Sequence, residues 1–220
     1  MTVARPDPAS WAVMVLTDAS RGRSHVELAR LAIEGGADAI QLREKDAACR
    51  EIHAIALEIR RLTREAGAAF IVDDRLEVAL ASDADGVHLG QEDLLAALAR
   101  KILGPGKLLG VSAGSAEEAL IAERDGADYI GFGPVFEARS SKPDAGAPLG
   151  LERLAIARAR CTLPIVGIGG IDARNAASVI AAGASGVAVI SAVAAADDIP
   201  RATRELRAAV LAARARGAAR

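Results

Sequence analysis

The stretch Ala69–Asp93, AFIVDDRLEVALASDADGVHLGQED, contains two short apolar runs with a helix-like segment between them. The first run, Ala69–Asp73, ends in the acidic pair Asp73-Asp74, and the second, Gly86–Leu89, leads into Asp93. Short apolar runs that alternate with helical segments are typical of buried parallel strands in an α/β fold. In this stretch the polar residues gather where the apolar runs end.

The same unit recurs along the whole chain. The apolar runs that predict strands are Ala12–Thr17, Ala39–Arg43, Ala69–Asp73, Gly86–Leu89, Leu108–Ser112, Tyr129–Val135, Pro164–Gly169 and Gly186–Ser191. Eight strand–helix units in 220 residues match the (β/α)8 TIM barrel, which carries its active site at the C-terminal ends of the strands. We therefore predict a single-domain α/β protein, a TIM barrel over residues 1–220, with residues 1–11 as an extended lead-in and residues 214–220 as a frayed tail.

Helix signals fit this division. Ser24 with Glu27 forms a capping-box pattern before a helix that ends at Gly35. We expect a long helix from about Ala47 to Ala66, a helix capped by Asp172, and a closing helix over Pro200–Ala213.

A short phrase repeats between the helices and the strands that follow them. Gly-Ala-Asp occurs at Gly36–Asp38 and Gly126–Asp128, with related forms at Ser82–Gly86 and Gly183–Gly186. These positions belong to the N-terminal face of a barrel, which serves stability, so we assign them no catalytic role.

Composition restricts the class of function. The chain is 51% hydrophobic and 25% charged, with a net charge of −2 and a pI near 6.0, which disfavours a general nucleic-acid or anionic-membrane binder. No apolar run approaches the roughly 20 residues of a membrane span. Cys49 and Cys161 lack the spacing of a disulfide framework or zinc site. We expect a cytoplasmic protein without nucleic-acid or membrane partners, and whether it is a homo-oligomer stays open.

Gln41, Arg43 and Lys45 alternate at the end of the second predicted strand. A period of two places all three side chains on one side of an extended chain. Inside a barrel mouth this gives one amide and two cations that face inward, where an anion would have to satisfy the arginine. A phosphate or diphosphate fits this pattern. The alternative is a solvated loop in which Glu44 pairs with the cations.

Asp73 and Asp74 end the third predicted strand, and Asp93 follows the fourth. Because neighbouring parallel strands end at the same edge, Asp74 and Asp93 can meet. Two carboxylates with few other ligands suit Mg²⁺, which keeps waters and accepts phosphate oxygens. The alternative is that each aspartate caps a helix. Opposite Arg43 and Lys45, the pair favours a metal–diphosphate site.

A second anion site is indicated near the seventh and eighth strands. Gly169-Gly170 and Ile190-Ser191 stand where many barrels build a phosphate cup from backbone N–H groups, although glycines there also occur in simple tight turns. The long segment Glu137–Gly150, with its Ser and Lys side chains, could lie between the two sites. Two phosphorylated small-molecule substrates that meet in one mouth are the resulting hypothesis.

The three histidines do not form a catalytic set with any serine or cysteine. His25 and His53 lie on helix patterns and are expected at the surface. His88 lies within the fourth strand and is expected to be a hydrogen-bonded core residue.

With these residues in view, the chain resembles the thiamine-phosphate synthase family. The matching segments follow the family order and cover nearly the whole chain: Gln41–Lys45, Ile71–Arg75, Gly86–Asp93, Gly110–Ser112, Asp128–Phe136, Pro164–Ile171 and Gly186–Ser191. The first four are fairly specific, and the last two are shared more widely among phosphate-binding barrels.

The resemblance implies a transferase of thiamine biosynthesis. Such an enzyme condenses 4-amino-5-hydroxymethyl-2-methylpyrimidine diphosphate with hydroxyethylthiazole phosphate, or its carboxylated form, to thiamine phosphate and diphosphate. The pyrimidine methylene would carry a carbocation that the thiazole nitrogen captures, which needs no protein nucleophile.

The resemblance also implies residue roles. Gln41, Arg43 and Lys45 would hold the pyrimidine diphosphate, Asp73 would contact the pyrimidine, and Asp74 and Asp93 would bind Mg²⁺. Ser112 and Lys142 would reach the diphosphate, and with Arg43 they are the implied catalytic residues. The thiazole phosphate would be bound by Arg139, Ser140, Ser141, Gly170, Ile190 and Ser191.

The sequence departs from the family at three places. Asp73 stands where Asn is usual, Gly114 stands where His is common, and the segment Glu137–Lys142 replaces a Thr-rich run. The Phe136-Glu137 start of that segment looks more like the related thiazole tautomerase, which uses the missing His. The alternatives are therefore a tautomerase-like enzyme and a non-catalytic paralogue that binds phosphate ligands.

Overall fold

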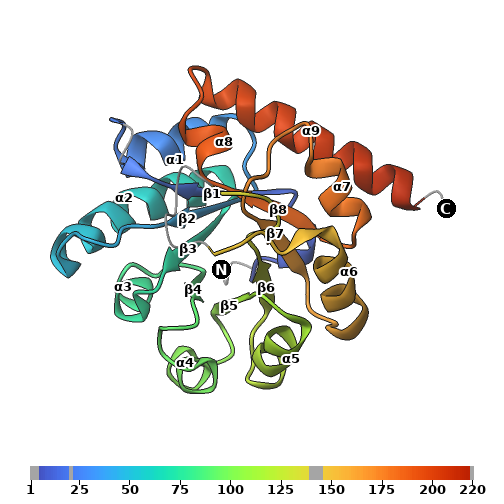
Figure 1. Ribbon diagram of the computed structural model, residues 1–220. Helices are drawn as coiled ribbons and strands as arrows, with labels where there is room; N and C mark the ends of the chain where they lie inside the picture. Colours follow the sequence, from blue (N-terminus) through green and yellow to red (C-terminus); the bar gives the residue numbers. More distant parts are fainter. Residues whose placement is uncertain (1–4, 20–21, 139–145, 219–220) are drawn as a thin grey trace.

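The computed structural model describes residues 5–19, 22–138 and 146–218. Its eight strands pair in parallel and close into a barrel in the order β1 to β8. Figure 1 shows the helices as a ring around this barrel. The predicted (β/α)8 TIM barrel is confirmed.

The strands are β1 (Val13–Thr17), β2 (Ala39–Leu42), β3 (Ala69–Asp73), β4 (Gly86–Leu89), β5 (Leu108–Ala113), β6 (Tyr129–Phe132), β7 (Ile165–Ile168) and β8 (Gly186–Val189). The helices are the 3-10 helix η1 (Pro8–Ser10) and the α-helices α1 (His25–Glu34), α2 (Cys49–Ala66), α3 (Leu76–Ala81), α4 (Ala96–Leu103), α5 (Ala116–Arg124), α6 (Gly150–Arg160), α7 (Ala176–Ala181), α8 (Ser191–Ala194) and α9 (Ile199–Ala218).

The apolar side chains form two separate cores. The larger lies between the strands and the surrounding helices and includes Ile40, Leu42 and Val72. The smaller fills the barrel interior and includes Met14 and Tyr129. Because each strand is buried on both faces, its sequence is a nearly continuous apolar run, which is why the strands could be predicted.

The register of β3 against β4 brings the predicted acidic residues to one edge. Asp73 pairs with His88 across the two strands, and the backbone N–H of Asp74 donates to the His88 carbonyl at 2.8 Å. Asp74 then turns the chain with a positive φ of 59°. Aspartate tolerates this left-handed conformation better than most residues. The turn places Asp74 at the mouth, beside the loop that follows β4.

The Gly-Ala-Asp turns are structural, as predicted. In three of these turns an aspartate accepts hydrogen bonds from backbone N–H groups at the start of a neighbouring strand, whereas Gly183–Gly186 has Ser185 at the corresponding position. The pairs are Asp38 with Ala12 and Val13 at 2.9 and 3.0 Å, Asp85 with Phe70 at 2.8 Å, and Asp128 with Leu109 at 2.7 Å. An arginine from a covering helix also contacts each of these aspartates: Arg207, Arg60 and Arg100 respectively. The N-terminal face of the barrel is therefore fastened to its helices.

Substitution of Asp85 tests this fastening. Arg60 is 8% exposed and makes two hydrogen bonds to Asp85, at 2.8 and 2.9 Å. In Asp85→Ala this buried charge loses its partner, so the free energy of unfolding should fall by about 3–5 kcal/mol. Urea denaturation measures the loss. Arg61→Ala, which breaks an exposed helix pair with Glu65, is the control and should cost less than about 1 kcal/mol. Equal losses in both variants would contradict the prediction.

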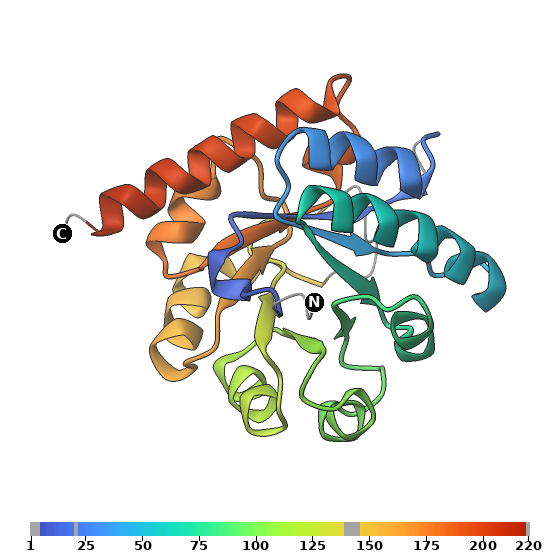
Figure 2. The ribbon, with the colours of Figure 1, turned by 180° about the vertical axis from the view of Figure 1, so that it is seen from behind.

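Both chain ends are more ordered than the sequence suggested. Pro8–Ser10 form η1 within the expected extended lead-in, with Asp7 as its cap. The expected frayed tail is wrong for residues 214–218, which continue α9. The Arg214 guanidinium donates to the carbonyl of Ser10 at 3.0 Å and also contacts those of Trp11 and Ser185, which ties the helix to the barrel. In Figures 1 and 2 the C-terminal end of α9 extends past the ring of helices.

The prediction that Asp172 caps a helix is wrong. Helix α7 begins at Ala176 after Asn175. The Asp172 carboxylate instead accepts from the backbone N–H of Arg174 at 2.8 Å and pairs with the guanidinium of the same residue. Within the described residues, no helix is both long and apolar enough to cross a membrane.

Candidate active site

A cavity of about 1080 Å³ opens at the C-terminal ends of the strands. Ten of the predicted site residues line it: Gln41, Arg43, Lys45, Asp73, Asp74, Asp93, Ser112, Gly170, Ile190 and Ser191. The other four, Arg139, Ser140, Ser141 and Lys142, lie outside the described residues. The barrel thus brings residues from six strand ends into one mouth.

The cations from the end of β2 contact the carboxylates from the end of β3. Lys45 Nζ lies 3.3 Å from Asp73 Oδ2 and also contacts Asp74, and Arg43 Nε lies 3.9 Å from Asp73 Oδ2. Burial would lower the pKa of Lys45, but its contacts with the two aspartates hold that pKa above its usual value. This side of the cavity therefore carries fixed positive charge beside carboxylates, rather than the solvated loop that was the alternative.

Asp73 is buried at the base of this cluster, with 9% exposure. Burial first, and the charge of Asp74 second, raise the pKa of Asp73 to about 6, although Lys45 and Arg43 act in the opposite direction. Asp73 therefore holds its proton more tightly than an ordinary aspartate does.

Asp74 and Asp93 meet, as their strand positions predicted. Burial raises the pKa of Asp93, the backbone N–H of Gly90 opposes the rise at 2.6 Å, and contact with the Asp74 carboxyl raises it again. Two carboxylates held against each other beside a cavity attract a cation, and their oxygens fit the preference of Mg²⁺. No cluster of three or more His, Cys, Asp or Glu side chains suited to a metal occurs among the described residues. The protein ligands on offer are therefore few, which suits an ion that keeps waters.

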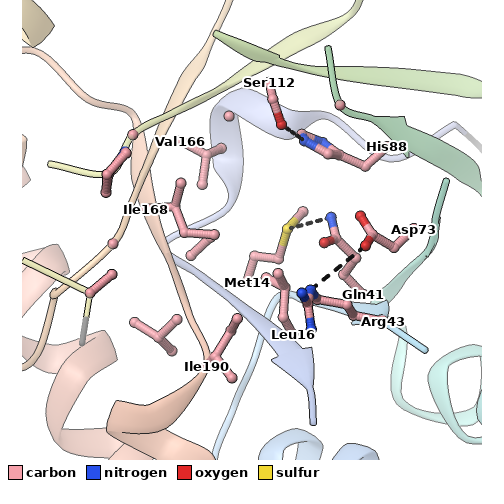
Figure 3. Close-up of a pocket in the computed structure, with 18 of the residues that line it drawn as sticks. Met14, Leu16, Gln41, Arg43, Asp73, His88, Ser112, Val166, Ile168 and Ile190 are labelled. Atoms are coloured by element: carbon pink, nitrogen blue, oxygen red, sulfur yellow. Dashed lines mark hydrogen bonds and ion pairs between the residues drawn. The ribbon is translucent and has the colours of Figure 1, made fainter. Parts of the chain in front are cut away.

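The rest of the cavity wall contains an apolar part. Met14 and Leu16 from β1, Val166 and Ile168 from β7, and Ile190 after β8 line the cavity next to the polar cluster (Figure 3). Of these residues only Ile190 was predicted from the sequence, although alternate residues of the same strand runs indicate the others. A ligand with a charged end and a flat apolar part fits between the two sides.

The glycines after β7 have a structural explanation. Gly169 and Gly170 have φ values of 97° and 64°. A Cβ atom at Gly169 would lie 2.6 Å from Pro134, and one at Gly170 would lie 2.6 Å from the Glu137 carbonyl. Close packing of this turn against the segment after β6 is therefore enough to require both glycines. They line the cavity but do not by themselves indicate phosphate.

The end of β5 carries contacts that the sequence analysis did not foresee. The Gly114 backbone N–H donates to Glu118 Oε2 at 2.7 Å, and the Gln91 side-chain amide donates to the Ser112 carbonyl. Both Gln91 and Glu118 line the cavity. A carboxylate thus lies beside the glycine that stands where the family often has histidine.

The prediction that His25 and His53 lie at the surface is wrong for His25, which is 4% exposed. His25 Nδ1 lies 2.7 Å from Thr17 Oγ1, and Nε2 lies 3.0 Å from Glu44 Oε2. His53 is half-buried, and its Nε2 is fully covered without a hydrogen-bond partner among the described residues. His88 is a hydrogen-bonded core residue, as predicted.

Glu44 braces the loop that carries Arg43 and Lys45. Besides His25, its carboxylate accepts the backbone N–H groups of Asp46 at 2.8 Å and Ala47 at 3.2 Å. The Asp46 hydrogen bond is the largest factor that lowers the pKa of Glu44 below 4.5; partial burial opposes it, and His25 adds to it. The ionised carboxylate therefore stabilises the folded loop.

Glu44→Gln should destabilise the protein in a pH-dependent way. A lowered pKa means that the stabilisation is fully present above pH 4.5 and is lost as the pH falls through the folded-state pKa. We expect a loss of about 1 kcal/mol near pH 7 that shrinks below pH 4.5, measured by urea unfolding across this range. Glu65→Gln, at an exposed helix pair, is the control and should show little change. A loss that stays constant with pH would argue against the role of the charge.

The fold and the mouth together define a (β/α)8 barrel of the kind that handles small anionic substrates at its strand ends. The family model described as thiamine monophosphate synthase matches residues 12–193. The chain belongs to this family.

Curated relatives support the assignment. The chain is 58% identical over 202 residues to the thiamine-phosphate synthase of Moorella thermoacetica. The match covers 92% of this chain and 96% of the relative. It is 57% identical to that of Chloroflexus aurantiacus, with 91% and 93% coverage. Among solved structures, the thiamine phosphate pyrophosphorylase from Pyrococcus furiosus matches with a TM-score of 0.86 and 45% identity over 94% of this chain and 98% of that one. These relatives favour the synthase over the tautomerase-like enzyme and the non-catalytic paralogue.

Proposed function

We propose that this protein catalyses the reaction for which its relatives are named, the formation of thiamine phosphate. The substrates would be the pyrimidine diphosphate and the thiazole phosphate, and the products thiamine phosphate and diphosphate. The observation that carries the proposal is the mouth itself, in which Arg43 and Lys45 lie beside Asp74 and Asp93 on one side of the cavity. Cations and a carboxylate pair in contact are the groups that a metal-bound diphosphate needs.

The polar side would bind the pyrimidine diphosphate. Gln41, Arg43 and Lys45 would donate to its oxygens and its ring, and Asp74 and Asp93 would hold Mg²⁺. When bound, Mg²⁺ supplies positive charge that stabilises the diphosphate as it leaves. Ser112 and Lys142 would donate to the same group. The thiazole phosphate would be bound by Gly170, Ile190 and Ser191 after β7 and β8, with Arg139, Ser140 and Ser141.

The chemistry requires positioning and charge compensation. The bond between the pyrimidine methylene and the diphosphate oxygen breaks, and its electron pair leaves with the diphosphate. The lone pair of the thiazole nitrogen then forms the new C–N bond. No proton needs a dedicated base in this step, so positioning and charge compensation are what the mouth has to supply.

Asp73 replaces the usual asparagine without removing the acceptor. Its carboxyl oxygen can accept a hydrogen bond from the amino group of the pyrimidine, as an amide oxygen would. With a pKa near 6, it also retains a proton in a fraction of molecules near neutral pH, and in that form it can donate. The reaction would take place in the cytoplasm, and the metal would be Mg²⁺.

A turnover assay tests the proposal. Purified protein is mixed with both substrates, with and without Mg²⁺, and thiamine phosphate and released diphosphate are followed. Formation of both products in equal amounts, only with Mg²⁺, is the expected result. Binding of the thiazole phosphate without product would instead favour the tautomerase-like or non-catalytic alternative.

A further inference from the structure

A hydrogen-bonded row of side chains runs along the cavity wall across three neighbouring strands. His88 on β4 lies between Ser112 on β5 and Tyr129 on β6. His88 Nε2 is 3.0 Å from Ser112 Oγ, and His88 Nδ1 is 3.1 Å from the Tyr129 hydroxyl. Figure 3 shows the His88–Ser112 contact at the edge of the cavity. Ser112 is the member of the row that was assigned to the diphosphate.

The strands leave room for this row. A Cβ atom at Gly110 would lie 2.2 Å from Tyr129 Cζ and 2.5 Å from His88 Nδ1. A Cβ atom at Gly131 would lie 2.8 Å from His88 Cε1. Since both contacts are shorter than real Cβ atoms tolerate, only glycine permits the two rings to lie side by side. The row therefore depends on Gly110 and Gly131 as well as on the three residues that form it.

The direction of the hydrogen bonds follows from Tyr129. It is fully buried, and burial above all raises its pKa far above 10, so the hydroxyl keeps its proton. A side-chain hydrogen bond with Gln41 opposes that rise. The phenol proton is then free to be donated to His88 Nδ1.

A neutral imidazole has one donor and one acceptor nitrogen. When Nδ1 accepts from Tyr129, the ring proton lies on Nε2, which then donates to Ser112 Oγ. The serine oxygen is then occupied as an acceptor on the His88 side, and its own proton can point into the cavity. A hydroxyl held in this way is a ready donor to an anion.

We propose that Tyr129 and His88 are positioning residues that fix Ser112 as a hydrogen-bond donor toward the cavity. That the acceptor is a diphosphate oxygen rests on the proposed function. The orientation of the row does not, because it is a property of the protein without substrate.

The tautomer of His88 is the first measurement. Nitrogen-15 NMR of the substrate-free protein distinguishes a protonated Nε2 from a protonated Nδ1. The chain has three histidines, so His88→Gln assigns the signal. We expect the proton on Nε2 in the wild type and a mixture of both tautomers in Tyr129→Phe. A wild-type proton on Nδ1, or an unchanged tautomer in Tyr129→Phe, would overturn the proposal. The wild-type result needs no variant to fold.

A double-mutant cycle tests whether the row acts through Ser112. Tyr129→Phe should lower kcat about tenfold, the value of one hydrogen bond, while KM for the thiazole phosphate stays the same. In the Ser112→Ala background the same change should have almost no further effect. Independent losses that multiply would show that Tyr129 does not act through Ser112.

Trp11→Phe is the matched control. Trp11 packs edge-on against the Tyr129 ring at 5.3 Å and does not touch its hydroxyl through any described hydrogen bond. This variant should lower the melting temperature while the His88 tautomer and kcat stay unchanged. A shift of the tautomer in Trp11→Phe as large as that in Tyr129→Phe would mean that ring packing, rather than the hydroxyl, sets the row. If the wild type shows no synthase turnover, the NMR result still decides the orientation.

Discussion

Asp74→Asn is expected to lower the Mg²⁺-dependent kcat by about a thousandfold and to leave the fold intact. The variant removes one of the two carboxylates that meet at the mouth, and with it half of the negative charge available to the metal. Asparagine is preferable to alanine here because Asp74 has a φ of 59°, which asparagine adopts readily and alanine does not. The measurements are kcat at saturating substrate over a range of Mg²⁺ concentrations, and the melting temperature.

Asp83→Asn is a matched control for the backbone conformation and the charge change. Asp83 also has a positive φ, of 51°, and also contacts a lysine, Lys107, but it lies on the N-terminal side of β4. The same chemical change in the same backbone conformation should leave both turnover and its Mg²⁺ dependence unaltered. Titration calorimetry with Mg²⁺ alone gives a second readout, in which Asp74→Asn should lose affinity and Asp83→Asn should not. Full activity in Asp74→Asn would remove Asp74 from the metal site.

The position of Asp74 could be predicted from sequence because the barrel converts strand order into spatial order. A residue at the end of a strand lies at the mouth, and residues two apart share a face. Those two rules place Gln41, Arg43 and Lys45 together, and Asp74 beside Asp93, without any knowledge of distances. The apolar wall was within reach of the same rules.

Contacts between side chains of distant elements were not predictable in this way. His25 lies on a helix pattern that suggests exposure, but it is buried, with its two ring nitrogens hydrogen-bonded to Thr17 and Glu44 from two other segments. Tyr129 and His88 are 41 positions apart, and periodicity says only that each faces the barrel interior. From the sequence Arg214 belongs to a polar tail, whereas in the structure its guanidinium donates to the backbone carbonyls of Ser10 and Ser185. A pattern fixes a residue's orientation within its own element, whereas its partners depend on how the elements pack.

Arg43→Ala is expected to weaken binding of the pyrimidine diphosphate by about a hundredfold and binding of the thiazole phosphate by much less. Arg43 extends from the end of β2 into the polar side of the cavity and lies 3.9 Å from Asp73. A guanidinium that donates two charge-assisted hydrogen bonds to one diphosphate contributes about 3 kcal/mol. The thiazole phosphate was assigned to Ile190 and Ser191 after β8, and Arg43 is not among the residues assigned to it.

Three variants measured together separate the two sides of the cavity. Arg43→Lys keeps the charge but loses the planar fork, so its affinity for the pyrimidine diphosphate should fall between those of the wild type and Arg43→Ala. Ser191→Ala should show the reverse preference and weaken the thiazole phosphate more. Dissociation constants for each substrate alone, from calorimetry, avoid any dependence on the slow step of turnover. Equal losses for both substrates in Arg43→Ala would contradict two separate sites, because a residue that contacts only one ligand should not contribute the same binding energy to both.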